Sequence, residues 1–140
     1  MKVLVFGGSS VIGSRLVSAL GADYTYFNNK IPIKNGFKVD IRDKEGTINL
    51  IKKLKPNTVV HGAAAPSMDV CEKDKNLAYD INISGTKNIV EGCEAIGAKI
   101  VFLSTSAVFD GKKKIYTEKD ETCAISYYGA TKAEAEKIVA

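Results

Sequence analysis

The sequence has little of what disulfide-linked, metal-binding and membrane-spanning proteins need. Its cysteines, Cys71, Cys93 and Cys123, are odd in number and widely spaced, which argues against a disulfide framework and a zinc site. The single histidine, His61, excludes a site built from several histidines. No apolar run approaches the roughly 20 residues of a membrane span. We therefore expect a protein of the reducing cytoplasm, without a metal site or a membrane segment.

An excess of charge of one sign is also missing. Twenty basic and 16 acidic residues leave a formal net charge of +4. The densest basic run, Lys112–Lys114, is followed by Glu118, Asp120 and Glu121, which cancel it locally. A nucleic-acid-binding surface needs a larger and less mixed basic patch, so we expect no nucleic-acid partner. The remaining composition, 45% hydrophobic and 26% charged in 140 residues, is that of one globular domain.

Short apolar runs alternate with helical periodicity along the chain. We expect strands at 3–6, 24–27, 37–41, 58–61 and 99–103, helices at 11–20, 47–54, 77–96 and 127–140, and a mixed-charge loop at 106–125. This alternation predicts an α/β fold, a three-layer Rossmann-type doubly wound parallel sheet in the order 3-2-1-4-5. Such sheets usually have about six strands. We therefore interpret residues 1–140 as an NAD(P)-binding Rossmann domain that is truncated before a C-terminal substrate-binding domain.

A glycine-rich segment, Gly7-Gly8-Ser9-Ser10-Val11-Ile12-Gly13, joins the first strand to the first helix. In this context Gly7 permits a tight turn, Gly13 allows close packing, and the free N–H groups of the helix face a pyrophosphate. Ser10 stands where the usual spacing has its middle glycine, and its Cβ is expected to crowd the phosphate. We predict that the cofactor contacts Gly7, Ser9, Ser10, Val11, Ile12 and Gly13. The alternative is that the segment is a plain strand-to-helix turn with no ligand.

The end of the second strand distinguishes NAD from NADP in this fold, because an acidic residue there binds the ribose 2′-hydroxyl. The chain has Asn28-Asn29-Lys30 and no acid at this position. Lys30 is a candidate partner for a 2′-phosphate, the alternative being an ordinary surface lysine. We therefore expect NADP(H) to be preferred, with NAD(H) as the alternative cofactor.

Three further residues form a candidate catalytic group. Tyr128 and Lys132 are four residues apart and lie on one face of the last helix. Thr105 follows the fifth strand, and the carboxyl ends of parallel strands line the ligand crevice. An ammonium beside a tyrosine lowers the pKa of its phenol, so Tyr128 is expected to exchange a proton with a carbonyl oxygen. Taken alone, the Tyr-x-x-x-Lys pair also fits a solvated helix face.

In this order the motifs make the sequence resemble the extended short-chain dehydrogenase/reductases, and among them the dTDP-4-dehydrorhamnose reductases. The segments that carry the resemblance are 7–13, 39–43 (Val-Asp-Ile-Arg-Asp), 60–64 (Val-His-Gly-Ala-Ala), 80–86 (Asp-Ile-Asn-Ile-Ser-Gly-Thr), 103–111 and 128–132. The resemblance implies that Thr105, Tyr128 and Lys132 are catalytic, and that Tyr128 and Lys132 also contact the cofactor.

The resemblance implies further roles around the cofactor. It places Asp40 and Ile41 at the adenine, Ala63, Ala64 and Ala65 beside the cofactor, and Asn82 as a support for the active site. It also places 69–72 near the substrate or a partner subunit, so a homodimer is a further expectation.

The function implied is NADP(H)-dependent reduction of a 4-keto nucleotide sugar. The alternatives are a non-catalytic cofactor-binding subunit, like the regulatory subunit of methionine adenosyltransferase, and an epimerase or dehydratase. Ser106 and Ala107 replace the aspartate and tyrosine that are frequent in the reductase group.

Overall fold

The sheet of the computed structural model, which describes residues 1–140, contains five parallel strands. They are β1 Val3–Phe6, β2 Asp23–Tyr26, β3 Gly36–Lys38, β4 Thr58–His61 and β5 Lys99–Phe102. Their spatial order is β3-β2-β1-β4-β5, with every neighbouring pair parallel. The predicted strand order and the Rossmann-type fold are therefore confirmed.

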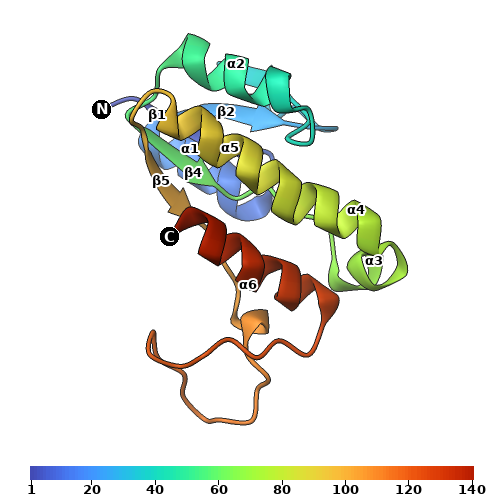
Figure 1. Cartoon of the computed structure of the whole chain (residues 1–140). Coiled ribbons are helices and arrows are strands. Elements are labelled where there is room, and N and C mark those ends of the chain that lie inside the picture. The colour runs from blue at the N-terminus through green and yellow to red at the C-terminus, as the bar shows by residue number, and fades with distance from the viewer.

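Helices cover both faces of this sheet. They are α1 Val11–Leu20, α2 Lys44–Leu54, α3 Met68–Lys73, α4 Lys75–Tyr79, the π-helical η1 Asp80–Ser84, α5 Gly85–Glu94, the 3₁₀ turn η2 Ser106–Val108 and α6 Tyr127–Val139. Figure 1 shows α2, α5 and α6 in front of the sheet and α1 behind it. None of these helices is both long enough and apolar enough to cross a membrane.

The alternation of side chains along β1 builds two cores. Phe6 packs in a buried cluster with Ile51 of α2 and Ile89 of α5. Val5, its neighbour in the strand, points to the opposite face and packs with Val17 of α1. Every residue of β1 is buried, as expected for a central strand covered on both faces. Each such side chain contributes about 1.5–3 kcal/mol to stability.

Several element boundaries differ from those predicted. Strand β3 ends at Lys38, because Asp40 begins a turn in which its carbonyl oxygen accepts the N–H of Asp43. Asp43 then caps α2, so this helix starts three residues before the predicted position. The helix α3 was not predicted. The single helix expected at 77–96 is divided into α4, η1 and α5.

The segment between β5 and α6 runs away from the sheet, as the orange loop at the bottom of Figure 1 shows. It is the mixed-charge loop that the sequence predicted, apart from the turn η2. Phe109 and Tyr116 stack with ring centroids 4.3 Å apart, and Lys113 pairs with Asp120. These contacts order the loop although most of it is exposed.

Candidate active site

A groove of about 450 Å³ lies where β1, β2 and β4 end. The predicted cofactor residues that line it are Gly7, Ser9, Ser10, Asn28, Asn29, Asp40, Ile41, Ala63 and Ala64. Because Asp40 and Ile41 follow β3, the structure brings together the segments that follow four neighbouring strands, β1 to β4. This is the edge at which open parallel sheets bind ligands.

Two glycines allow the first turn to approach its neighbours. Gly7 has a φ of 77°, a conformation that L-residues rarely adopt, and a Cβ there would lie 2.8 Å from the backbone nitrogen of Ala63. A Cβ at Gly13 would collide with the carbonyl oxygen of Gly7. The tight turn and the close packing expected of these glycines are thus present, and they leave a backbone-lined cradle beside α1.

Ser10 is the N-cap of α1. Its φ of −73° is ordinary, and its Oγ accepts the N–H of Gly13 at 3.0 Å. Its hydroxyl is therefore turned back to the helix, while Ser10 lines the groove and the expected crowding of a phosphate by its Cβ stays a prediction. The hydroxyl satisfies one of the N–H groups that a helix start leaves unpaired.

Other predicted cofactor residues do not line the groove. Val11 and Ile12 point into solvent and are 83% and 62% exposed. Lys30 lies in a separate shallow depression with Pro32 and Lys34. The hydroxyl of Tyr24 donates to the carbonyl oxygens of residues 31 and 33 and so fixes this loop outside the groove. Lys30 therefore does not line the groove in this structure, and its pairing with a 2′-phosphate stays a prediction.

Conversely, the groove contains residues for which no role was predicted, Phe27 and Arg42 above all. Asp40 Oδ1 accepts from Arg42 Nε at 2.9 Å, and Asp40 Oδ2 accepts from Arg42 Nη2 at 2.6 Å. The Arg42 guanidinium holds the pKa of Asp40 below its ordinary value. Arg42 follows Asp40-Ile41 directly, so the motif that located the adenine contacts was also the available signal for Arg42.

Lys132 connects α6 to the end of β5. The side chain is 3% exposed, and Nζ donates to the carbonyl oxygen of Leu103 at 2.7 Å. Nζ also lies 3.9 Å from the ring centroid of Phe102. Burial lowers the pKa of Lys132 to about 8. Lys132 Nζ is therefore held at Leu103, two residues before Thr105, and the lowered pKa still leaves it mostly protonated at neutral pH.

Thr105 and Tyr128 are brought together by a close backbone contact. Thr105 caps η2, its Oγ1 accepting the N–H of Ala107 at 3.2 Å. A Cβ at Gly129 would collide with the carbonyl oxygen of Ala107, so α6 packs directly on η2. Tyr128 precedes this contact in the chain. The segment of Thr105 and the helix of Tyr128 and Lys132 thus pack on each other next to β5, and none of the three residues lines the groove.

The expected effect of Lys132 on Tyr128 is not observed. Burial, and secondly the nearby thiol of Cys71, raise the pKa of Tyr128. The Tyr128 ring packs against the small buried cluster of Ala65, Cys71 and Ala78, while Lys132 Nζ is engaged at Leu103. The prediction that Lys132 lowers the pKa of Tyr128 is therefore wrong for this arrangement of side chains.

Asn82 links the groove segment to α6, the helix of Tyr128 and Lys132. Its Oδ1 accepts the N–H of Ala65 at 2.8 Å, and its Nδ2 donates to Thr131 Oγ1 at 2.9 Å. Thr131 donates in turn to the carbonyl oxygen of Tyr128 at 2.8 Å. Asn82 and Ala65 are both buried and do not line the groove itself. They join its wall to α6, and the implied support of an active site by Asn82 stays a prediction.

The buried lysine makes stability depend on pH. An unfolded lysine titrates near 10.4. Between this value and about 8, the unfolded chain binds more protons, so the contribution of Lys132 to the free energy of unfolding rises with pH. From pH 8 to pH 10 we expect the unaltered chain to gain about 1–3 kcal/mol relative to Lys132→Met, measured by urea unfolding.

The variant is compared at each pH because other groups titrate in the same range. Burial raises the pKa of Cys93 to about 11, which acts in the opposite direction in both proteins. The difference between the two proteins isolates Lys132. An identical pH dependence in both would contradict the low pKa of this side chain.

Known proteins match this chain over nearly its whole length. The family model described as "RmlD substrate binding domain" matches residues 1–140. Methionine adenosyltransferase 2 subunit beta of Rattus norvegicus is 35% identical over 146 residues, covering 99% of this chain and 42% of that protein. The dTDP-4-dehydrorhamnose reductase of Aggregatibacter actinomycetemcomitans is 29% identical over 139 residues, covering 99% and 46%.

Solved structures agree with these relatives. A hypothetical dTDP-4-dehydrorhamnose reductase from Sulfolobus tokodaii superposes with a TM-score of 0.93 at 33% identity, covering 99% of this chain and 51% of that one. The Bacillus anthracis reductase in complex with NADP gives a TM-score of 0.84 at 29% identity, covering 99% and 49%. The Thermus thermophilus UDP-glucose 4-epimerase complexed with NAD gives 0.84 at 32%, covering 98% and 49%.

The chain spans about half the length, or slightly less, of the relatives it matches. The matched residues, 1–140, include the glycine-rich turn, the groove and the segments of Thr105, Tyr128 and Lys132. The chain therefore belongs to the RmlD substrate-binding-domain family, the dTDP-4-dehydrorhamnose reductase-like branch of the extended short-chain dehydrogenase/reductases.

Proposed function

We propose that residues 1–140 are the cofactor-binding and catalytic part of an NADP(H)-dependent reductase of a 4-keto nucleotide sugar, of the dTDP-4-dehydrorhamnose type. The observation that carries this proposal is the packing of the Thr105 segment on α6, which bears Tyr128 and Lys132. This packing lies at the same strand ends as the groove. The proposed site is cytoplasmic, in keeping with three cysteines that form no disulfide.

The groove fits the adenosine and diphosphate part of a nicotinamide dinucleotide. Its volume of about 450 Å³ is that of a small-molecule site. Gly7 leaves the cradle that a Cβ would fill, and the start of α1 supplies N–H groups and a favourable dipole for a diphosphate. Asp40 presents carboxylate oxygens that accept from an adenine amino group. The wall of Gly62, Ala63 and Ala64 is flat and small enough for the cofactor to pass towards β5.

The bound nicotinamide supplies hydride to the substrate carbonyl, and the chain supplies the proton. Tyr128 Oη donates this proton to the carbonyl oxygen as it gains negative charge. The phenol is protonated at neutral pH and can donate, although burial, by raising the pKa of Tyr128, makes it a weaker proton donor. Thr105 Oγ1 donates a hydrogen bond to the same oxygen and orients it. Lys132, whose Nζ is held at the carbonyl oxygen of Leu103, is the proposed contact to the cofactor beside Thr105.

A second candidate is a cofactor-binding regulatory subunit without catalysis. It is favoured by the 35% identity to methionine adenosyltransferase 2 subunit beta. The presence of all three residues, Thr105, Tyr128 and Lys132, favours the reductase. A dehydratase would need acid and base side chains beside Thr105, and Ser106 and Ala107 supply none. Nucleotide-sugar reduction, rather than cofactor binding, therefore separates the two leading candidates.

Cofactor titration tests the binding half of the proposal. We expect the chain to bind NADP⁺ at least as tightly as NAD⁺, because no acidic residue follows β2. Isothermal titration calorimetry of both cofactors measures this directly. A preference for NAD⁺ of tenfold or more, about 1.4 kcal/mol, would contradict the expected specificity. Absence of binding by either cofactor would contradict the proposed function itself.

A further inference from the structure

Few charged side chains line the groove. Of the side chains that line it, only Asp40 and Arg42 carry a charge. Arg42 is therefore its single cationic residue, and Lys30 contributes nothing to it. Arg42 is thus the only positively charged side chain in the groove lining that can bind a phosphate group of a ligand.

The guanidinium of Arg42 is held in a defined orientation. Asp40 takes the Nε and Nη2 side of the fork, with contacts of 2.9 and 2.6 Å. Arginine has five N–H donors in one plane, so this pairing leaves the Nη1 hydrogens and one Nη2 hydrogen unused. The remaining edge presents two parallel donors, the geometry that suits bidentate binding of a phosphate.

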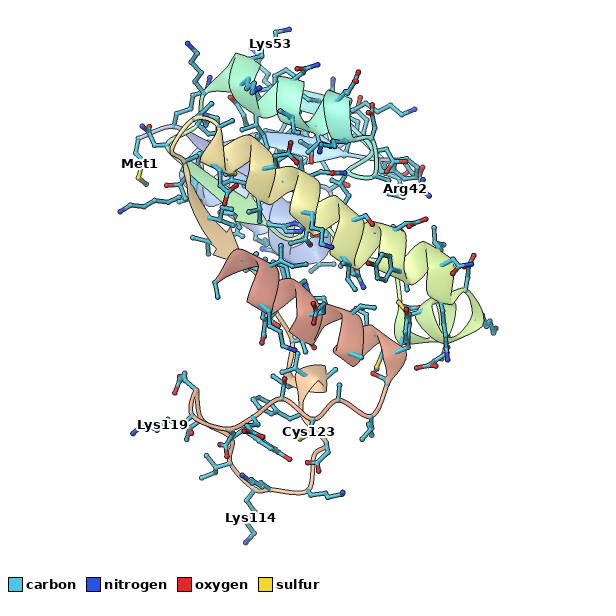
Figure 2. All side chains as sticks on the ribbon, viewed as in Figure 1. Met1, Arg42, Lys53, Lys114, Lys119 and Cys123 are labelled. Atoms are coloured by element: carbon cyan, nitrogen blue, oxygen red, sulfur yellow. The ribbon has the colours of Figure 1, made fainter.

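The position of Arg42 along the groove is fixed by Phe27. The guanidinium carbon lies 5.7 Å from the ring centroid of Phe27, the residue that directly follows β2. In a Rossmann-type site the ribose 2′ position of the adenosine faces the end of the second strand. Figure 2 shows Arg42 at the end of the molecule opposite Met1, that is at the carboxyl edge of the sheet. Asn28 and Asn29, which follow Phe27, add polar but uncharged groups.

We infer that Arg42, positioned by Asp40 and Phe27, binds the 2′-phosphate of NADP(H) and determines the preference for this cofactor over NAD(H). This inference rests on the proposed function, since it specifies which group of the cofactor Arg42 recognises. It assigns to the segment after β3 a task that the sequence alone suggested for Lys30 after β2. The exposed ring of Phe27, 49% accessible, supplies the apolar surface on which the guanidinium rests.

Asp40 limits how strongly Arg42 can favour NADP(H) over NAD(H). Its carboxylate orients Arg42, but its negative charge opposes a phosphate dianion close by. The pair therefore gives a moderate preference for NADP(H) with retained use of NAD(H). We expect that removal of the Arg42 fork lowers the affinity for NADP⁺ about 10- to 100-fold, the usual effect of losing hydrogen bonds to a charged group.

The test compares five proteins by calorimetry: the unaltered chain, Arg42→Gln, Arg42→Lys, Lys30→Gln and a control variant, Arg15→Gln. The probes are NADP⁺ and NAD⁺, together with the fragments adenosine 2′,5′-bisphosphate and adenosine 5′-monophosphate. Arg42→Gln is expected to weaken both 2′-phosphorylated probes about 10- to 100-fold and to leave the other two within about threefold. Arg42→Lys keeps the charge but loses the fork, and its loss is expected to be intermediate.

Arg15→Gln is the matched control, because Arg15 is the other arginine of the chain and is exposed on α1 away from the groove lining. It is expected to bind all four probes like the unaltered chain. The inference is overturned if Lys30→Gln, rather than Arg42→Gln, loses the 2′-phosphorylated probes, or if Arg42→Gln weakens all four probes equally. If the unaltered chain binds neither NADP⁺ nor NAD⁺, the proposed function fails, and the inference with it.

Discussion

Tyr128→Phe is expected to lower the rate of carbonyl reduction by about 10²–10⁴-fold while leaving the affinity for the cofactor nearly unchanged. The phenol oxygen is the proposed proton donor, whereas the ring that remains still packs against Ala65, Cys71 and Ala78. The assay follows oxidation of NADPH by dTDP-4-dehydrorhamnose. It uses residues 1–140 joined to the C-terminal half of the Bacillus anthracis reductase, of which this chain matches 49%.

The parent chimaera with Tyr128 intact provides the reference rate, and Tyr127→Phe provides a matched control on the neighbouring residue. Tyr127 donates its backbone N–H to Glu72 at the start of α6, and its hydroxyl has no proposed chemical role. The control is therefore expected to retain activity. Wild-type activity in Tyr128→Phe would show that the proton comes from another group, and the catalytic assignment would then be wrong.

Gly129→Val is expected to destabilise the chain by about 3 kcal/mol or more. A Cβ at this position collides with the backbone oxygen of Ala107, which cannot move without displacing η2 and Thr105. The free energy of unfolding in urea measures the loss.

Ala130→Val is the control for this substitution. It places the same side chain on the next residue of α6, where the position is exposed, and it is expected to cost less than about 1 kcal/mol. Equal destabilisation by the two substitutions would mean that helix propensity, and not the contact between α6 and η2, decides the stability of this region.

The strand order was predictable because it depends on patterns that span the whole chain. The buried run of β1, the turn at Gly7 and the alternation of elements leave few topologies that satisfy right-handed crossovers. Segments that follow the strands were predictable for the same reason, and Asn28, Asn29, Asp40 and Ile41 do line the groove.

The errors arise where one side chain decides the local structure. Lys30 was predicted to pair with a 2′-phosphate because its loop follows β2, but the hydroxyl of Tyr24 binds the carbonyl oxygens of residues 31 and 33, and Lys30 does not line the groove. Arg42 was missed because its position depends on the pairing with Asp40. The pKa of Tyr128 depends on which cluster its ring enters, and helical spacing from Lys132 does not determine that choice.

The π-helical turn η1 joins α4 to α5 and sets the rotation of one helix relative to the other about their common axis. A π turn holds an extra residue, and each residue of an α-helix advances the side-chain direction by about 100°. The residues before and after η1 therefore face directions that an uninterrupted helix would not combine. Asn82 is turned to Ala65 and Thr131, while Ile89 remains directed at the sheet. The segment of α4, η1 and α5 thereby supports the proposed active site and the hydrophobic core at the same time, and its helix is locally wider at η1.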